Sequence, residues 1–330
     1  MKYVELTDFG LPWEVCRVVD GPALDAPGPD EVSVRIEAGP INPAELLLTE
    51  GKYASKPPLP VRLGIEGVGT VSKIGADVKD IAVGDRVMSL GRTNWAEEIT
   101  VAAESVIKVP RDVDVQQLSM LKVNPATAQL MLERYVDLKP GDWVIQNAAN
   151  SAVGYYLIQI AKARGLHTVN VVRRAELGEQ LRSAGADLVF VEGDDLADRV
   201  RAEIGDANMP LAIDAVGGTA CLHLGGAISD GGTIVNYGLL SGEPCQVGAD
   251  MTIFRSITLT GFWLAKLLGD MSRPQLEELY AGLAGQIAQG AIHAPVTACY
   301  DLDNLEAALR HAYQSGRDGK VLIAPNGVPA

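Results

Sequence analysis

The sequence predicts an α/β protein in which a β-rich domain is followed by a doubly wound parallel sheet. Residues 1–120 contain short alternating segments separated by dense Gly and Pro, as in GPINP and KPPLP. After about Pro125, short apolar segments alternate with stretches of helical apolar spacing, which is typical of successive βαβ units. A chain of 330 residues is also long for a single core, which favours two domains.

The first domain is expected to be mostly β. Apolar and polar residues alternate over 32–37, which predicts a half-buried strand. Further strands are predicted at 67–74 and 85–90, each bounded by glycine-containing turns. We expect this domain to span 1–120.

The second domain is expected to span 121–289. Its predicted strands are 143–149, 168–172, 188–191, 211–216, 233–237 and 257–262, and its predicted helices include 152–164, 175–184 and 195–204. Two more helices, 274–289 and 302–315, precede a last strand at 320–323. We expect residues from about 290 to 330 to return to the first domain and complete it.

The charge balance argues against nucleic acid and membrane partners. There are 42 acidic and 28 basic residues, a formal net charge of −14, so the chain repels polyanions at long range. No uninterrupted apolar run approaches the roughly 18 residues that span a bilayer. The first residues show neither an apolar signal core nor an Arg-rich amphipathic pattern, so we expect a cytoplasmic location.

Metal ligation has little support in the sequence. The four cysteines are scattered without a C-x-x-C pair, and the four histidines form neither an H-x-x-x-H nor an H-E-x-x-H pattern. We therefore expect no metal, and we expect the cysteines to be reduced thiols without a functional role.

A candidate dinucleotide turn follows the strand at 143–149. It reads Asn-Ala-Ala-Asn-Ser-Ala-Val-Gly over 147–154, and a predicted helix begins within it. Small residues there let the backbone approach a pyrophosphate at the helix N-terminus. Ala149 and Ser151 stand where glycines are usual, and Gly154 is kept. The alternative is an ordinary α/β turn with small residues for packing.

The end of the next strand indicates which dinucleotide binds. It carries Arg173 and Arg174, and no acid appears until Glu176. NAD sites place an acid there for the ribose 2′-hydroxyl, whereas two guanidiniums suit the 2′-phosphate of NADP. NADPH is the predicted cofactor; a solvated arginine pair is the alternative.

Several segments resemble one family along nearly the whole chain. They are PINPAEL at 40–46, GKY at 51–53, GIEG at 64–67, LKVNPAT at 121–127, VIQNAANS at 144–151, NVVR at 170–173 and GFWL at 261–264. Together they resemble the zinc-independent medium-chain dehydrogenases/reductases, and among them the 2-enoyl thioester reductases (enoyl-CoA and enoyl-ACP reductases). The resemblance implies a GroES-like catalytic domain and a Rossmann domain that binds NADPH. It excludes the zinc branch, because Ile65 replaces the ligand histidine of a G-H-E turn.

The resemblance also implies a reaction and its residues. NADPH delivers hydride to the β-carbon of a 2-enoyl thioester, and Tyr53 gives a proton to the α-carbon, since a phenol keeps its proton at neutral pH. Trp263 is expected beside the nicotinamide and the substrate. The remaining cofactor positions are Asn124, Asn150, Ser151, Ala152, Val153, Arg173, Arg174, Tyr237, Gly238, Leu239, Leu240, Phe262, Leu264 and Lys320. The family's second basic residue is Ala175 here, which leaves the phosphate to the arginine pair.

Two other functions stay open at this point. One is a reductase of quinones or small enones, and the other is a non-catalytic NADPH-binding protein. Basic residues at the mouth of the site would favour CoA or acyl carrier protein, with Arg62, Arg255 and Lys266 as candidates. The family resemblance further implies a homodimer, for which the apolar strand at 257–262 could supply the edge.

Overall fold

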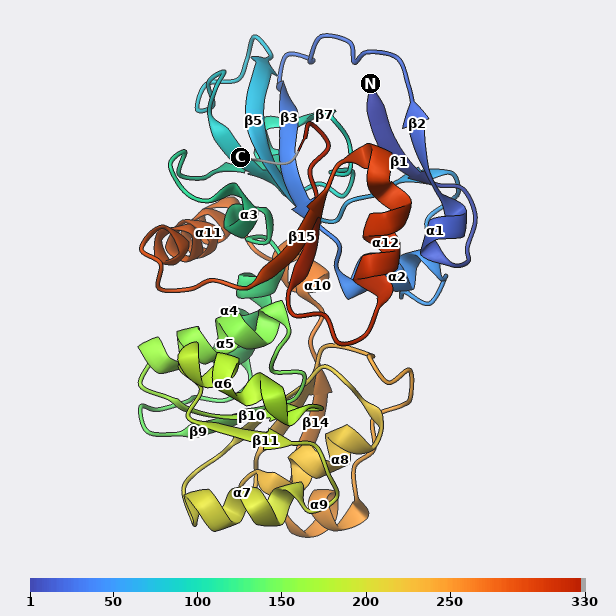
Figure 1. Ribbon diagram of the computed structural model, residues 1–330. Helices are drawn as coiled ribbons and strands as arrows, with labels where there is room; N and C mark the ends of the chain where they lie inside the picture. The colour runs from blue at the N-terminus through green and yellow to red at the C-terminus, as the bar shows by residue number, and fades with distance from the viewer. Residues whose placement is uncertain (328–330) are drawn as a thin grey trace. The chain divides into compact units, whose positions relative to one another are not determined.

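The computed structural model describes residues 1–327 and divides the chain into two compact units. Unit 1 comprises Met1–Val123 and the chain from Ser272 onward, and unit 2 comprises Asn124–Met271. Each unit has its own arrangement of strands and helices (Figure 1). Among the described residues, no helix has the length and apolar character needed to cross a bilayer.

The return to the first domain comes earlier than the sequence predicted. We expected it near residue 290, but helix α11 (Arg273–Ala288) already belongs to unit 1. The Arg273 guanidinium donates to the carbonyls of Glu104 and Val106 at 2.7 and 2.9 Å. The buried Tyr280 hydroxyl donates to the Lys122 carbonyl at 3.0 Å. These long-range bonds are made by single side chains, so apolar periodicity gave no sign of them.

Unit 1 is built on β-sheet, as predicted. A small antiparallel sheet has the order β2–β1–β4, and a larger one has the order β15–β16–β3–β5–β6–β8 with β7 also paired to β3. The strands are β1 (Lys2–Leu6), β2 (Cys16–Asp20), β3 (Glu31–Pro40), β4 (Val61–Arg62), β5 (Gly67–Ile74), β6 (Arg86–Ser89), β7 (Glu98–Ala102), β8 (Val106–Lys108), β15 (Val296–Tyr300) and β16 (Lys320–Ile323). Since β16 pairs antiparallel with β3, the last strand completes the first domain.

Helices connect and cover these sheets. They are α1 (Pro12–Val15), α2 (Pro43–Thr49), α3 (Val115–Ser119), α11 and α12 (Leu305–Tyr313), with the 3-10 turns η1 (Ala103–Ser105) and η3 (Leu302–Asn304). Helix α12 lies along β15 and β16 (Figure 1). Its apolar face, Leu305, Ala308, Leu309 and Ala312, repeats at helical spacing and packs with Val4 and Leu6 of β1 in one core.

Unit 2 has a parallel sheet with the order β11–β10–β9–β12–β13–β14. Its strands are β9 (Trp143–Gln146), β10 (His167–Val172), β11 (Leu188–Val191), β12 (Leu211–Asp214), β13 (Thr233–Asn236) and β14 (Thr258–Gly261). This is the 3-2-1-4-5-6 order of doubly wound dinucleotide folds, and it confirms the predicted fold class. In β10, the residues from Thr168 to Val172 are all buried, as expected for a strand covered on both faces.

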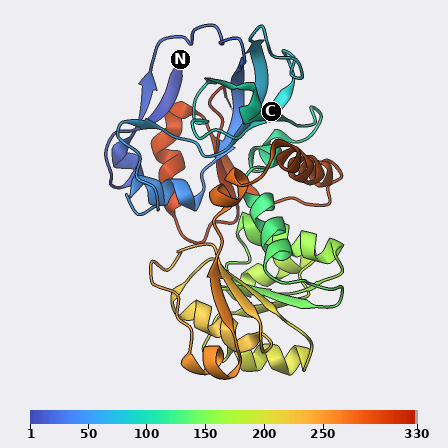
Figure 2. The same ribbon diagram turned by 180° about the vertical axis from the view of Figure 1, so that it is seen from behind.

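Helices cover both faces of this sheet. They are α4 (Asn124–Arg134), α5 (Ala152–Ala163), α6 (Gly178–Ser183), α7 (Leu196–Ile204), α8 (Gly218–Ala227), α9 (Ala249–Phe254) and α10 (Leu264–Gly269), with the 3-10 turn η2 (Ala175–Leu177). Helices α4, α5 and α6 lie on one face and α7, α8 and α9 on the other (Figure 1). Strand β14 forms one edge of the sheet, shown in orange in Figure 2.

Gly154 sets how closely α5 approaches the turn that precedes it. A Cβ at this position would lie 2.2 Å from the Ala149 carbonyl oxygen. We expect Gly154→Ala to destabilise the protein by about 1–3 kcal/mol, because the helix would have to move away from the turn. The measurement is the free energy of unfolding from urea titration.

Gly282→Ala is the matched control, since Gly282 lies inside α11, where an added Cβ would meet no neighbouring atom within 4 Å. This change should stabilise by up to about 1 kcal/mol through helix propensity. The same shift for both variants would contradict the close-approach role of Gly154.

Candidate active site

The carboxyl ends of the parallel strands bring most of the predicted cofactor residues to one edge of unit 2. Residues 147–153 follow β9, Arg173 and Arg174 follow β10, residues 237–240 follow β13, and residues 262–264 follow β14. Because these strands are parallel, the segments that follow them emerge on the same side of the sheet. Segments separated by more than a hundred positions in sequence thus line a single edge.

The turn after β9 has the features that a bound pyrophosphate needs. Ala148 adopts a left-handed conformation with φ of 47°, and Ser151 caps α5 by accepting a hydrogen bond from the Gly154 N–H at 3.1 Å. The first N–H groups of a helix lack partners within the helix and point toward its N-terminus. Gly154, the glycine of the usual pattern that is kept, lets α5 approach the Ala149 carbonyl, since a Cβ there would lie 2.2 Å from its oxygen.

Tyr237 comes directly after β13, in one of the predicted cofactor segments. Burial raises the pKa of the Tyr237 phenol above its usual range, and Ser151 of the turn acts against this shift. Tyr237 therefore stays neutral at physiological pH.

A buried carboxylate lies where the strand order reverses, between β9 and β12. Asp214 accepts hydrogen bonds from Asn147 Nδ2 at 2.6 Å and from the Val216 and Gly217 N–H groups at 2.9 and 3.0 Å. The Asn147 amide oxygen in turn accepts from the Ala215 N–H at 2.7 Å. This network holds the turns after β9 and β12 against each other at the place where such folds bind ligands.

Arg173 and Arg174 are open to solvent at the end of β10. Arg173 is exposed, and Arg174 is partly exposed with its Nε 3.5 Å from Glu176 Oε1. An exposed ion pair of this kind is weak, so the guanidinium can turn to a stronger anion. The pair fits a dianionic phosphate in both charge and geometry.

The segment after β14 carries the aromatic residues of the prediction. Phe262 is buried and packs 6.5 Å from Tyr135, whose hydroxyl donates to the Gly261 carbonyl at 2.9 Å. Trp263 is the N-cap residue of α10 and is 47% exposed. This exposure distinguishes Trp263 from a core tryptophan, and an aromatic ring at the surface of a site is suited to contact a flat ligand. Leu264 follows on the first turn of α10.

The other predicted cofactor residues are divided between the units. Asn124 is buried at the first residue of α4, and Leu239 and Leu240 are 43% and 57% exposed. Lys320 and Tyr53 belong to unit 1.

Tyr53 follows helix α2 in unit 1. Its backbone N–H donates to the Leu47 carbonyl at 3.1 Å, and its ring is partly buried against the core that includes Ile41 and Leu48. The Arg92 guanidinium lies 5.9 Å from the centre of the Tyr53 ring. Arg92 is exposed, and sequence reasoning missed it because it is 39 positions away, in a loop without a recognisable motif.

The start of α2, the helix that precedes Tyr53, is held by two buried carboxylates. Glu45 accepts from the Asn42 N–H at 2.9 Å and from the Ile65 N–H at 2.8 Å. Glu66 accepts from Asn42 Nδ2 at 2.7 Å and from the Val123 N–H at 2.8 Å. Glu66 thus links the start of α2 to Val123, the last residue before the chain enters unit 2.

Two buried lysines compensate these carboxylates. Lys320 Nζ donates to Asn42 Oδ1, and Lys122 Nζ donates to the carbonyls of Ile65, Leu90 and Gly91. Burial raises the pKa of Glu66 to about 7 and lowers the pKa values of Lys122 and Lys320 to about 8. The attraction between these opposite charges acts against both shifts.

This network shows the surroundings of the predicted residue Lys320. Its ammonium is buried and bound to Asn42, which is itself bound to Glu66, so its position is fixed within unit 1. Sequence reasoning identified Lys320 by resemblance but did not identify its partner Asn42, nor Lys122, which interacts with the same carboxylates. The signal available was the charged residues inside otherwise apolar segments, such as Leu121-Lys122-Val123.

Two of the three basic candidates for carrier binding have structural contacts instead. The Arg255 guanidinium bonds Asp230 at 2.7 Å and donates to the carbonyls of Gly225, Gly226 and Ile228. Arg62 stacks 3.9 Å from the centre of the Tyr3 ring. Lys266 is exposed on α10.

Family models match both units. The alcohol dehydrogenase GroES-like domain matches residues 28–111, and the zinc-binding dehydrogenase model matches residues 152–281. The second description mentions zinc, but Ile65 has no donor atom at the position of the resembled ligand histidine.

Curated relatives extend over most of the chain. The mitochondrial enoyl-acyl-carrier-protein reductase of Rattus norvegicus is 37% identical over 84% of this chain and 77% of its own length. The enzyme of the same name from Dictyostelium discoideum is 32% identical over 98% of this chain and 94% of its own length.

Solved structures with the same fold include reductases of two kinds. A complex of Etr1p with NADP and crotonyl-CoA has a TM-score of 0.88 at 27% identity, covering 98% of this chain and 99% of that one. The mitochondrial 2-enoyl thioester reductase Etr1p/Etr2p heterodimer from Candida tropicalis has a TM-score of 0.84 at 28% identity, with the same coverage. Escherichia coli quinone oxidoreductase with NADPH has a TM-score of 0.89 at 26% identity, covering 98% of this chain and all of that one.

The extent of these matches at more than 30% sequence identity decides the family. The chain belongs to the enoyl-acyl-carrier-protein reductases, the 2-enoyl thioester reductases of the medium-chain dehydrogenase/reductase superfamily.

Proposed function

We propose that the protein reduces the C=C bond of a 2-enoyl thioester with NADPH, and that Tyr53 supplies the proton. The observation that carries the proposal is the edge of the parallel sheet in unit 2. This edge combines a turn of small residues that includes Gly154, at the N-terminus of α5, with an arginine pair at the end of β10. The family relationship supports the thioester as substrate.

The residues of unit 2 suit NADPH. Residues 150–153 would hold the pyrophosphate, Arg173 and Arg174 the 2′-phosphate, and Trp263 the nicotinamide end. When bound, the cofactor supplies a hydride for the β-carbon. The chain's own task is to orient the dinucleotide and to shield it from water.

Tyr53 completes the reduction in this proposal. Its hydroxyl hydrogen goes to the α-carbon, which needs a proton once the β-carbon has gained hydride. The Arg92 guanidinium, 5.9 Å from the centre of the Tyr53 ring, places a positive charge beside the phenol. The buried network of Glu66, Asn42 and Lys320 keeps the start of α2, and so the segment leading to Tyr53, in place.

Reduction of quinones or small enones is the second candidate, and the likeness to a quinone oxidoreductase favours it. The two are separated by the rate of NADPH oxidation with crotonyl-CoA, a longer 2-enoyl-CoA and a simple quinone. Faster turnover of the enoyl-CoA substrates supports the proposal, and turnover of the quinone alone overturns it. Binding of NADPH without turnover of any of them would indicate a non-catalytic protein. Whether the physiological carrier is CoA or acyl carrier protein follows from comparing the two thioesters.

We further propose that the protein is a homodimer that pairs through β14. This strand is an edge of the sheet. Its own Leu259 is 39% exposed, and Ile253 and Phe254 of the preceding helix α9 are 68% and 80% exposed. An open strand edge beside apolar side chains is unfavourable in water and suits a second copy. The relatives are named mitochondrial, so the expected cytoplasmic location stays a prediction from the sequence.

Tyr53→Phe removes the hydroxyl and keeps the ring. We expect kcat with crotonyl-CoA to fall by about 100-fold or more, because general acid catalysis is lost. Stopped-flow or steady-state absorbance of NADPH measures the rate, and the dissociation constant of NADPH should stay unchanged. An unaltered kcat would rule out Tyr53 as the proton donor.

Replacing Arg173 and Arg174 together by Ala should weaken NADPH binding by about tenfold or more, since charge-assisted hydrogen bonds to the 2′-phosphate are lost. NADH binding should not change. Fluorescence titration gives both constants. Arg182→Ala, an exposed arginine on α6, is the control that should leave both cofactors unaffected. Equal weakening of NADPH and NADH would count against the assigned role.

Phe254→Glu should shift the protein from dimer to monomer, because it buries a charge at the proposed interface. Analytical ultracentrifugation measures the mass. Val83→Glu is the control, since Val83 is 58% exposed in unit 1. A Phe254→Glu protein that sediments as the wild type does would show that the subunits meet elsewhere or not at all.

A further inference from the structure

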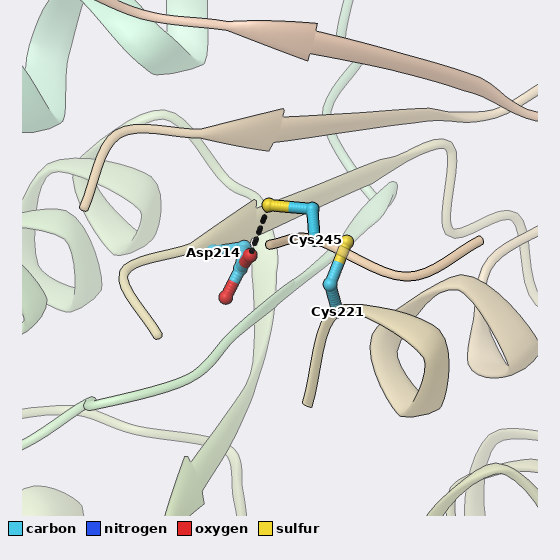
Figure 3. A group of neighbouring side chains, drawn as sticks. All are labelled: Asp214, Cys221 and Cys245. Atoms are coloured by element: carbon cyan, nitrogen blue, oxygen red, sulfur yellow. Dashed lines mark hydrogen bonds between the residues drawn. The ribbon is translucent and has the colours of Figure 1, made fainter. Parts of the chain in front are cut away.

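Two cysteines that are far apart in sequence meet beside a buried carboxylate in unit 2. Cys221 lies on α8, Cys245 lies in the segment before α9, and Asp214 ends β12. The ligand atoms of these three residues all lie within 4.8 Å of one another (Figure 3). The sequence showed four scattered cysteines and predicted reduced thiols; the structure adds that two of them lie close together.

The two thiols differ in access to solvent. Cys221 is fully buried, and Cys245 is partly exposed. The Cys245 Sγ lies 3.8 Å from Asp214 Oδ2 and is turned toward that carboxylate in Figure 3, and the two sulfurs lie within 4.8 Å of each other. Cys245 can therefore react with a dissolved reagent, and the buried thiol of Cys221 lies close enough to react with it next.

The contacts of Asp214 favour a covalent bond between the sulfurs over a metal ion. Its oxygens already accept from Asn147, Val216, Gly217 and Asn236, so the carboxylate has little capacity left for a cation. Burial, and next the charge of Asp214, raise the pKa values of Cys221 and Cys245. A metal would need both sulfurs as thiolates, which this site disfavours.

We propose that Cys221 and Cys245 form a reversible disulfide, so that this pair is a thiol modification site in the nucleotide domain. The oxidant is a peroxide. The Cys245 sulfur attacks one peroxide oxygen, the O–O bond breaks, and water leaves with a sulfenic acid formed on Cys245. The Cys221 sulfur then attacks the sulfenic sulfur, the S–O bond breaks, and a second water leaves as the S–S bond forms. Two thiols lose two electrons and two protons in total, and the peroxide takes them up.

The bond would fasten the segment that follows β13. This segment is attached to the turn after β12 by the Leu240 and Ser241 N–H groups, which donate to the carbonyls of Ala215 and Val216 at 3.2 and 2.9 Å. A disulfide at Cys245 adds a covalent attachment to α8 and closes the chain between the two cysteines. Oxidation should therefore raise the apparent Tm, because the unfolded chain is restrained.

The protonated state of the pair sets the speed of oxidation. Cys245 faces Asp214 on β12 and Cys221 on α8, and Glu243 lies in its own segment. Since the reactive species is the thiolate, the rate should be low at neutral pH and rise about tenfold per pH unit between pH 7 and 9.

The experiment treats the reduced full-length protein with hydrogen peroxide at pH 7 and pH 8.5, then alkylates the remaining thiols after denaturation. A protease that cleaves before aspartate separates the two cysteines at Asp230. We expect mass spectrometry to find the Cys221 and Cys245 peptides joined, to find more of the joined product at pH 8.5, and to find them separate after dithiothreitol.

Single variants test the order of the steps. Cys221→Ser should leave a sulfenic acid on Cys245 that dimedone traps, and Cys245→Ser should leave Cys221 reduced. Cys299→Ser, a partly exposed cysteine of unit 1, is the matched control and should form the disulfide as the wild type does. The wild-type result does not depend on the folding of any variant.

Three results would overturn the proposal. The first is full alkylation of both cysteines after peroxide treatment, and the second is a disulfide to Cys16, Cys299 or a second chain in place of the internal pair. The third is stoichiometric binding of Zn²⁺ by the reduced protein in equilibrium dialysis, abolished by either serine variant, which would make the cluster a metal site.

Discussion

The buried carboxylate of Glu66 is the interaction on which the organisation of unit 1 depends. It joins Asn42 at the start of α2 to Val123, the last residue of the unit's first segment, and its charge interacts with those of Lys122 and Lys320. Removing one member of such a network leaves a buried charge uncompensated, which is far more costly than losing an exposed ion pair. The segment that carries Tyr53 and the strand that carries Lys320 are therefore fixed by the same electrostatic cluster.

In unit 2 the equivalent constraint is the parallel sheet itself. Because the strands are parallel, the segments that follow them all emerge at one edge of the sheet. Residues that follow four different strands therefore come to the same edge although they are far apart in sequence. Asp214 and Asn147 then hold two of those loops together at the point where the strand order reverses. The cysteine pair lies beside the same carboxylate, so a change in its redox state would act on the structure that positions the cofactor segments.

The two units divide the proposed chemistry between them. Unit 2 offers backbone N–H groups, small residues and arginines, which suit a phosphorylated cofactor. Unit 1 offers a phenol, an exposed guanidinium and buried charges that hold them in place. The hydrocarbon side chain of Ile65 offers no metal ligand at its position, and charge that develops during reduction of a conjugated double bond can be stabilised by hydrogen bonding.

The sequence by itself determined the fold class, the alternation of strands and helices in unit 2, the arginine pair and the family, because periodicity and local motifs are properties of neighbouring residues. Strands 67–74 and 188–191 were predicted to the residue, since turn residues bound them on both sides. Only the tertiary structure decided that α11 belongs to unit 1, that Arg92 lies beside Tyr53, that Lys320 bonds Asn42, and that Cys221 meets Cys245. These are contacts of single side chains across long stretches of chain, and no local pattern encodes them.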